Sequence, residues 1–385
     1  MANTQAISDL LKRATDAGDV PGVVVAAGTA EGPIFAGASG VRDTASGAPM
    51  TADTVVWIAS MTKAVTGACA MQLVEQGRLS LDAPIATLLP GLGNAQVLEG
   101  FAADGSPRLR PARRPITLRH LLTHSAGFVY DIWNPEMARY LESTGTPGII
   151  SCANAALSIP LVFDPGERWD YGIGIDWAGK AVEAVTGQRL GAYMQQNLLQ
   201  PLGMTDTAFK IGPAQRQRLA KVHNRTPDGF EATDMELPQE PEFEMGGGGL
   251  YSTVGDYLRF TRMILNGGTL DGTRVLAHET VAAMSANAMG DLVCRPLKTA
   301  APPYSNHVDF IDGMQWGLSF LINPDPMPTG RSAGSLAWAG LANSYFWIDP
   351  ARQVTGVYAT QVLPFFDEKA VQLFQDFESA VYRLV

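Results

Sequence analysis

Ser60 and Lys63 are the residues whose types and spacing point most directly to chemistry. Side chains three positions apart share a face of a helix, so the serine hydroxyl and the lysine amine can meet within one turn. A serine becomes a good nucleophile only when a base takes its proton, and a lysine can act as that base only while it is neutral. The pair therefore predicts acyl chemistry on Ser60, against the simpler interpretation of a helix-capping serine and a solvent-seeking lysine.

The segment that carries this pair is predicted to be a buried helix. An apolar run at 55–58 leads into a helical pattern from about Ser60 to Gln76, and no charged residue occurs between Lys63 and Glu75. A helix this apolar is buried on most sides. Burial and the positive end of the helix dipole both favour a neutral Lys63.

The surrounding elements suggest one α/β unit built from both ends of the chain. Helical periodicity at 4–17 and 367–384 accompanies strand-like runs at 23–27, 34–36, 316–322, 337–348 and 354–360. The middle contains short helical patterns at 118–124, 175–185 and 190–199 between Pro- and Gly-rich turns. We therefore expect an α/β (α+β) domain from residues 1–80 and 240–385, an inserted mainly helical domain at 81–239, and an active site in the cleft between them.

Composition excludes several classes of protein. The 385 residues are 46% hydrophobic and 17% charged, with a formal net charge of -10, which is unsuited to disorder or to binding a phosphate backbone. Three cysteines at long spacings provide no zinc or disulfide framework. No apolar run approaches the ~18 residues of a membrane span, and no leader pattern opens the sequence. We expect a cytoplasmic protein that binds neither nucleic acid nor a membrane.

The sequence also resembles a known superfamily. The Ser60–Lys63 tetrad, followed by a helix of small residues, is similar to the active-site helix of the serine β-lactamases and penicillin-binding proteins. Further stretches resemble the class C branch in the same order, at 116–127, 165–171, 201–204 and 246–253. The resemblance implies a serine β-lactamase-like fold, with an antiparallel sheet flanked by helices, made from both termini, and a helical insert.

Two departures from the class C pattern narrow the expected function. The sequence reads Tyr171-Gly172-Ile173 where those enzymes carry Tyr-x-Asn, and Trp338-Ala339-Gly340 where they carry Lys-Thr-Gly. The missing amide and the missing cation would bind the side-chain amide and the carboxylate of a β-lactam, whereas a tryptophan offers a flat apolar wall. The tryptophan is typical of the family VIII carboxylesterases, which share the fold.

That resemblance implies a set of roles. Ser60 is the nucleophile, and Lys63 and Tyr171 share the proton shuttle, with the base left open between them because such a pair titrates as a unit. The oxyanion lies between the backbone amides of Ser60 and Leu341, and Trp338 and Gly340 contact the substrate. No metal or cofactor is required.

Other patterns have weaker implications. The aromatic side chains of Phe128, Tyr130 and Trp133 either line the acyl pocket or cap the helical domain, and both interpretations stay open. Gly330–Gly334 fits Gly-x-Ser-x-Gly but lacks the strand-to-helix turn that motif needs. His120 and His124 lack the glutamate of a His-Glu-x-x-His metal site. The Gly246–Gly249 run indicates a close backbone approach near the site.

The leading expectation is a serine carboxylesterase that hydrolyses short-chain acyl esters through an acyl-enzyme on Ser60, with weak β-lactam hydrolysis as an optional side activity. The alternatives are a class C-type β-lactamase or D-amino-acid peptidase, an acyltransferase of the same fold, and a non-catalytic binding homologue. The expected partner is a small-molecule ester.

Overall fold

The computed structural model describes residues 4–385 and is built around one large antiparallel sheet. Residues 1–3, where the leader pattern expected to be absent would begin, lie outside the described part. Strand β1 from the N-terminal end pairs with β16 from the C-terminal end, so the two ends of the chain share one sheet. In spatial order the strands are β12 (Gln315–Trp316), β13 (Leu321–Ile322), β14 (Leu336–Gly340), β15 (Ser344–Asp349), β16 (Val354–Ala359), β1 (Gly22–Thr29), β2 (Pro33–Asp43) and β3 (Ala48–Pro49).

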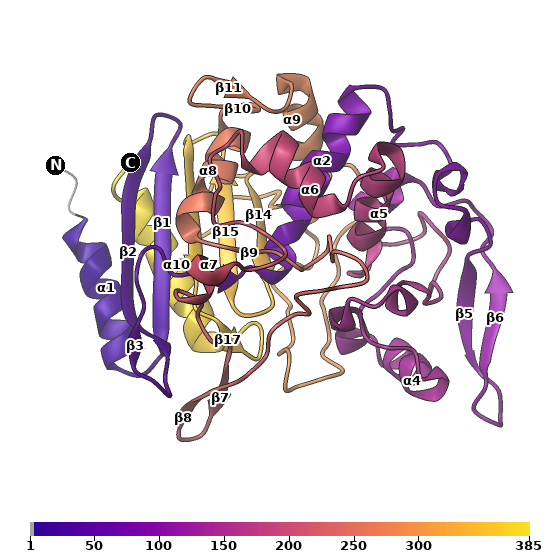
Figure 1. The fold of residues 1–385 in the computed structure, drawn as a ribbon, viewed down its shortest axis with the longest axis horizontal. Helices are drawn as coiled ribbons and strands as arrows, with labels where there is room; N and C mark the ends of the chain where they lie inside the picture. Colours follow the sequence, from indigo (N-terminus) through magenta and orange to yellow (C-terminus); the bar gives the residue numbers. More distant parts are fainter. Residues whose placement is uncertain (1–3) are drawn as a thin grey trace.

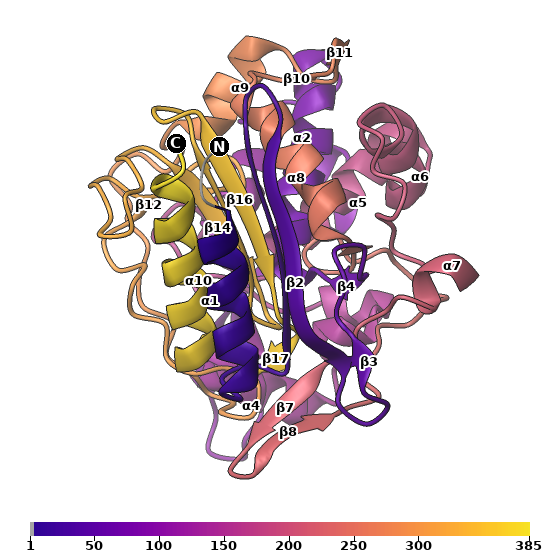
Figure 2. The ribbon, with the colours of Figure 1, turned by 90° about the vertical axis from the view of Figure 1, so that its left-hand side faces the viewer.

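Helices cover both faces of this sheet. The terminal helices α1 (Gln5–Asp16) and α10 (Glu368–Tyr382) lie side by side on one face (Figure 2). The buried side of α1 consists of Ile7, Leu11 and Ala14. On the other face α8 (Val254–Leu265) packs against β16, β1 and β15. The prediction of an antiparallel sheet flanked by helices and assembled from both termini is confirmed.

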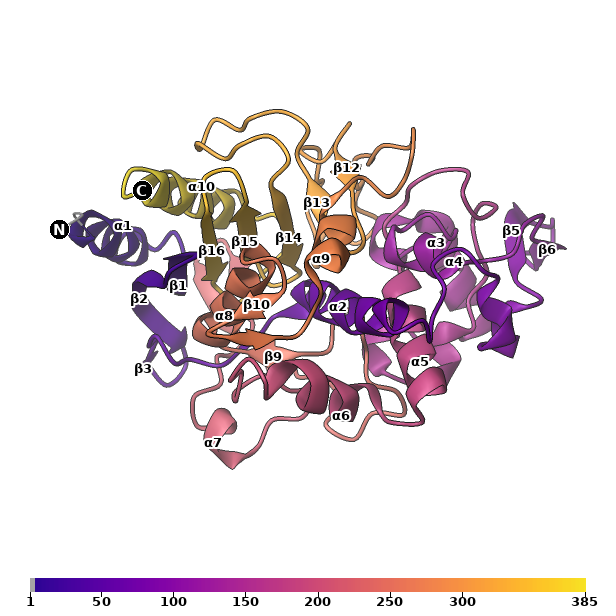
Figure 3. The same ribbon diagram turned by 90° about the horizontal axis from the view of Figure 1, so that it is seen from above.

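Helix α2 (Thr62–Glu75) runs between the sheet and the more helical part of the molecule (Figure 3). Twelve consecutive residues of α2, from Thr62 to Leu73, are buried, as its uncharged sequence predicts. It packs against α5 (Gly174–Thr186) and α6 (Leu190–Met194), so the helix that carries Lys63 has protein on all sides.

The helical part lies to one side of the sheet (Figure 1). The other helices of the chain are α3 (Leu118–Leu122), α4 (Pro135–Thr144), α7 (Pro213–Arg216) and α9 (His278–Ser285), the last of which contacts α2. Short strands accompany them: β4 (Val56–Trp57), β5 (Gln96–Phe101), β6 (Pro107–Pro111), β7 (His223–Thr226), β8 (Gly229–Ala232), β9 (Tyr251–Ser252), β10 (Thr269–Leu270), β11 (Thr273–Arg274) and β17 (Val362–Leu363).

Two hairpins in residues 81–239 differ from the helical expectation. In the β5–β6 hairpin, β6 has two arginines and two prolines in place of an apolar alternation, so the periodicity did not reveal it. The β7–β8 hairpin pairs through β7 with β17 near the C-terminus, so residues 223–232 lie against the α/β part. The boundaries drawn at 80/81 and 239/240 stay a prediction.

Two apolar runs that the sequence predicts to be single strands are interrupted in the structure. Residues 316–322 form the tight β12–β13 hairpin, where Ser319 adopts a positive φ of 84°. Residues 337–348 divide into β14 and β15 at Asn343, which has φ 54° and donates its amide to the carbonyls of Val362 and Pro364 at 2.8 Å. Hydrogen bonds to a distant segment create this turn, which local sequence does not reveal. No helix within residues 4–385 is long and apolar enough to cross a membrane.

Candidate active site

Ser60 lies on a strained turn between β4 and α2. The turn is a short 3₁₀ segment, η1 (Ala59–Met61), and Ala59 adopts a left-handed backbone with φ 44° although it carries a side chain. Such a conformation costs on the order of 1–3 kcal/mol and persists only where packing enforces it. Here β14 supplies the packing, because a Cβ on Gly340 would lie 2.4 Å from the carbonyl oxygen of Ile58. The turn directs Ser60 out of the sheet and into a cavity.

Lys63 is fully buried in the first turn of α2 and makes three hydrogen bonds. Its ammonium donates to Ser60 Oγ at 3.0 Å, to the Tyr130 hydroxyl at 2.9 Å and to the carbonyl oxygen of Gly247 at 2.5 Å. Burial lowers the pKa of Lys63 to about 7, against the opposing attraction of Asp176. A substantial fraction of this lysine is therefore neutral at physiological pH and can accept the proton of Ser60.

Tyr171 lies on the other side of the same lysine. Its ring centroid is 4.7 Å from Lys63 Nζ, and its hydroxyl accepts a hydrogen bond from the indole N–H of Trp338 at 2.9 Å. Burial raises the pKa of Tyr171 well above its usual value, while hydrogen bonding to Ser60 and Trp338 acts in the opposite direction. The residue is thus a neutral phenol, which can pass on its own proton while it accepts another. Trp338 is more than the apolar wall expected from its residue type, because it is also a donor.

The three aromatic residues after Gly127 occupy different places. Tyr130 and Trp133 line the main cavity, and the hydrogen bond between Tyr130 and Lys63 brings this tyrosine to the centre of the site. Trp133 donates its indole N–H to Ser305 Oγ at 3.0 Å, which fixes that wall. Phe128 does not line the cavity, because its ring stacks on Trp177 within the helical part with centroids 6.5 Å apart. The pocket interpretation of Phe128 is therefore wrong.

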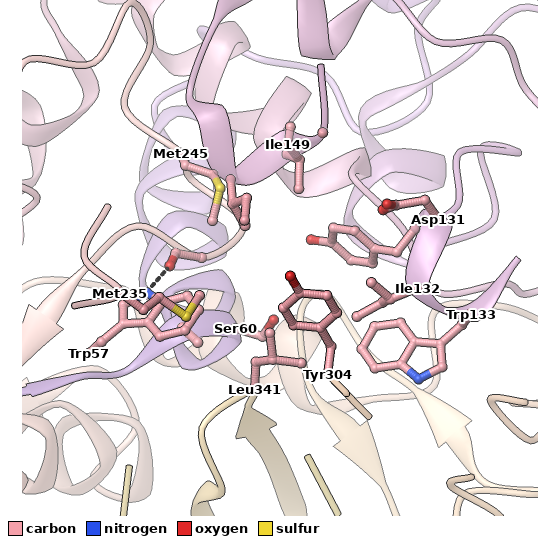
Figure 4. A pocket seen from close by; sticks show the side chains of 16 residues that line it. Trp57, Ser60, Asp131, Ile132, Trp133, Ile149, Met235, Met245, Tyr304 and Leu341 are labelled. Carbon is pink, nitrogen blue, oxygen red and sulfur yellow. Dashed lines mark hydrogen bonds between the residues drawn. The ribbon is translucent and has the colours of Figure 1, made fainter. Parts of the chain in front are cut away.

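The cavity above Ser60 has a volume of about 290 Å³ (Figure 4). Its walls are mostly apolar, and Asp131 is the only charged side chain among the described residues that line it. Burial raises the pKa of Asp131. Ile150 and Tyr304, both about two-fifths exposed, mark the entrance. The lining consists of Trp57, Ala59, Ser60, Tyr130–Trp133, Gly148–Ile150, Met235, Met245, Gly247, Gly248, Tyr304 and Leu341.

The two backbone amides expected to bind an oxyanion belong to neighbouring elements. Leu341 directly follows β14, lines the main cavity together with Ser60, and also lines a smaller adjoining hollow with Tyr171 and Trp338. Gly340 brings the end of β14 against the start of η1, so closely that a Cβ at this position would lie 2.4 Å from the carbonyl oxygen of Ile58. The structure therefore brings together Ser60, Lys63, Tyr171, Trp338 and Leu341, which are far apart in the sequence.

Asp176 is a residue that sequence reasoning missed. It is fully buried in the first turn of α5, and its Oδ1 accepts a hydrogen bond from the Gly247 amide at 2.8 Å. Burial raises its pKa to about 6, and the nearby Lys63 charge opposes this shift. The available signal was an acidic residue in an otherwise apolar helix start, five positions after Tyr171.

The glycine run of residues 246–249 makes the close approach that its sequence predicts. A Cβ on Gly247 would lie 2.4 Å from Asp176 Oδ2, and one on Gly248 would lie 2.5 Å from the end of Met245. The carbonyl of Gly246 accepts a hydrogen bond from Thr66 Oγ1 at 2.7 Å. The run therefore joins α2 to α5 through its backbone.

The remaining sequence patterns have structural roles. In the Gly330–Gly334 segment, Arg331 forms a buried ion pair with Glu378, and the Ser332 amide donates to Asp349. His124 is buried against Tyr171 with ring centroids 4.6 Å apart, and its Nδ1 accepts a hydrogen bond from the Gly172 amide. No group of three or more potential metal ligands occurs within residues 4–385.

The sequence is similar to that of a named esterase and to that of a named acyltransferase. The chain is 32% identical over 385 residues to a lovastatin esterase of Penicillium rubens, covering 96% of both chains. It is 34% identical over 353 residues to the monacolin J acid methylbutanoyltransferase of Aspergillus terreus, covering 87% of this chain and 83% of that one.

Solved structures of related proteins share the fold of this chain. Unliganded simvastatin synthase from Aspergillus terreus, in its selenomethionyl form, superposes with a TM-score of 0.85 at 31% identity, covering 99% of this chain and 98% of that one. A family VIII carboxylesterase shares the fold, with a TM-score of 0.71 at 20% identity and coverage of 99% and 97%. The family model described as Beta-lactamase matches residues 7–378, so the chain belongs to the β-lactamase family of serine enzymes.

Proposed function

We propose that the protein is a serine carboxylesterase that cleaves short-chain acyl esters through an acyl-enzyme on Ser60. The observation that carries this proposal is the 3.0 Å contact between Ser60 Oγ and a fully buried Lys63, at the floor of an apolar cavity. A nucleophile in hydrogen-bond contact with a base of suitable pKa is the central requirement of covalent acyl chemistry. The names of the esterase and acyltransferase relatives support the same class of reaction.

The reaction begins with proton transfer from Ser60 Oγ to the shuttle formed by Lys63 and Tyr171. The serine oxygen bonds to the acyl carbon, and the carbonyl oxygen becomes an oxyanion held by the backbone amides of Ser60 and Leu341. The bond to the alcohol oxygen then breaks, and the shuttle returns the proton to that oxygen. Water attacks the acyl-enzyme in the same manner, which releases the carboxylic acid and restores Ser60.

Within the β-lactamase family we assign the chain to the family VIII carboxylesterases. The assignment rests on the tryptophan at 338 and the isoleucine at 173, where class C β-lactamases carry the lysine and asparagine that hold their substrate. The cavity lining supports it, because its one charged side chain is acidic and repels the carboxylate of a β-lactam. We therefore expect β-lactam hydrolysis to be weak.

The test compares release of p-nitrophenol from p-nitrophenyl butyrate with hydrolysis of a chromogenic cephalosporin. We expect rapid ester cleavage, slow cephalosporin cleavage, and loss of both in Ser60→Ala. Ser332→Ala, which removes the serine of the Gly-x-Ser-x-Gly sequence, is the matched control and should retain activity. Full ester turnover by Ser60→Ala would refute the acyl-enzyme. Cleavage of the cephalosporin by the wild type at a higher rate than the ester would favour a β-lactamase. Binding of the ester without turnover would indicate a binding homologue.

Acyl transfer to an alcohol is the second candidate function. It is favoured by the apolar walls and volume of the cavity, which suit an organic acceptor beside the acyl group, and by the transferase relatives. Benzyl alcohol added to the butyrate assay distinguishes the two outcomes, because transfer yields benzyl butyrate whereas hydrolysis yields butyrate. A product ratio that follows the acceptor concentration would identify a transferase.

A further inference from the structure

Asp176 and Lys63 are two fully buried ionisable side chains that are connected by a single glycine. The amide of Gly247 donates to Asp176 Oδ1 at 2.8 Å, and the carbonyl of the same residue accepts from Lys63 Nζ at 2.5 Å. The carbonyl group of Gly247 thereby binds the lysine, and its amide group binds the carboxylate. The second carboxylate oxygen, Oδ2, is buried without a hydrogen-bond partner among the described residues.

The close packing at this point requires glycine. A Cβ at position 247 would lie 2.4 Å from Asp176 Oδ2 and 3.0 Å from Oδ1, closer than atoms pack in proteins. The absence of a side chain is what lets the carboxylate of α5 approach the backbone that holds Lys63. A buried carboxylate that leaves one oxygen unpaired is unfavourable by itself, so a compensating charge nearby is expected.

Four titratable side chains near this pair, among the described residues, are held neutral. Burial raises the pKa values of Tyr130 and Tyr171 and lowers the pKa of His124 well below its usual value. Burial also raises the pKa of Cys152, which senses the Asp176 charge, to about 12. Asp176 is therefore the acidic charge that acts on Lys63 in the folded protein.

We propose that Asp176 is a positioning residue that acts through the Gly247 backbone, holding Lys63 against Ser60 and opposing the loss of its proton. The proposal rests on the proposed serine mechanism. Asp176 touches neither Ser60 nor the cavity, so its role is to set how readily Lys63 exchanges a proton. A buried carboxylate near an ammonium favours the charged lysine, and removal of the carboxylate favours the neutral one.

Asp176→Asn tests the proposal, because an asparagine keeps an oxygen for the Gly247 amide while it removes the charge. We expect the acid limb of the kcat/KM profile for p-nitrophenyl butyrate to move to lower pH by about one unit or more. The matched control is Asp349→Asn, which alters another buried carboxylate that accepts backbone amides, at Ser332 and Ala351, away from the site. A purely structural role for Asp176 would lower Tm in both variants and leave both acid limbs in place, which would overturn the proposal.

A measurement on the wild-type protein covers the case in which Asp176→Asn does not fold. The ¹⁵N resonance of Lys63 Nζ, identified by its loss in Lys63→Met, should titrate in two steps, because coupled groups lose their protons in two macroscopic stages. A single-step titration would overturn the proposal. This readout requires no turnover, so absence of esterase activity would contradict the proposed function and leave the Asp176–Lys63 coupling to be decided separately.

Discussion

The indole N–H of Trp338 donates a hydrogen bond to the hydroxyl of Tyr171 at 2.9 Å. Trp338 lies on β14, two residues before the end of the strand, and Tyr171 lies in the turn before α5. The contact therefore connects the sheet to the helical part of the molecule directly beside Ser60. Together with hydrogen bonding to Ser60 and the packing of the neighbouring rings, it fixes the direction of this tyrosine.

Trp338→Phe removes this donor and keeps an aromatic ring. We expect kcat for p-nitrophenyl butyrate to fall about five- to tenfold, the worth of roughly one net hydrogen bond. Trp347→Phe is the matched control, because the indole nitrogen of Trp347 is buried without a hydrogen-bond partner among the described residues. That variant should retain its activity. An unchanged kcat in Trp338→Phe would show that Tyr171 is positioned without the indole.

The pKa of Lys63 predicts the pH dependence of acylation. In the proposed mechanism the active form carries a neutral lysine, and burial lowers the pKa of this group to about 7. The neutral fraction therefore grows as pH rises through 7, and kcat/KM should increase about tenfold per pH unit below that value and level off above about pH 8. Steady-state rates between pH 5 and pH 9, with substrate stability checked at each pH, measure this limb. A flat profile over the same range would contradict a lysine base.

The sequence predicted the fold from local patterns together with its resemblance to the β-lactamase superfamily, and it pointed to Tyr171, Trp338 and Leu341 only through that resemblance. The Ser60–Lys63 spacing, the uncharged helix after it and the terminal helix and strand periodicities are all visible without tertiary contacts. The structure places Ser60, Lys63 and Tyr171 together, and their catalytic roles stay a prediction. The close backbone packing around the site was predicted only at the glycine run of residues 246–249.

Other features depend on contacts between distant segments, and no local pattern encodes them. The hydrogen bond of Tyr130 to Lys63 spans 67 positions, and that of Gly247 to Lys63 spans 184. Phe128 and Tyr130 are two residues apart and both aromatic, yet one stacks on Trp177 and the other enters the site. Residue type alone could not separate them, because the direction of each side chain is set by the turn on which it lies.

Because the acidic side chain of Asp131 lines the cavity, we expect the enzyme to discriminate against anionic substrates. Asp131 is the one charged side chain among the described residues lining the cavity. Asp131→Asn should raise kcat/KM for an ester with a free carboxylate, such as p-nitrophenyl hemisuccinate, about three- to tenfold relative to p-nitrophenyl butyrate, because like charges at close range repel. The gain should shrink as salt is added. Asp234→Asn, at a carboxylate with a 99% exposed side chain, is the control and should leave the ratio unchanged.

Gly340→Ala tests whether the contact between β14 and η1 supports catalysis. The new methyl would lie 2.4 Å from the carbonyl oxygen of Ile58, so β14 and the turn carrying Ser60 must separate. Overpacking of this kind costs about 1–3 kcal/mol of unfolding free energy. Separation would also move the Leu341 amide away from Ser60, and loss of one oxyanion donor lowers kcat by about 10²–10³-fold.

Gly32→Ala provides the control for this substitution, because a Cβ at position 32 meets no atom within 4 Å. Its kcat and urea midpoint should match those of the wild type. The two effects of Gly340→Ala are separable, since kcat is measured at low temperature where the variant is folded. A variant that loses stability but keeps wild-type kcat would show that the Leu341 amide is not an oxyanion donor, and the oxyanion of the tetrahedral intermediate would then be stabilised by other groups around Ser60.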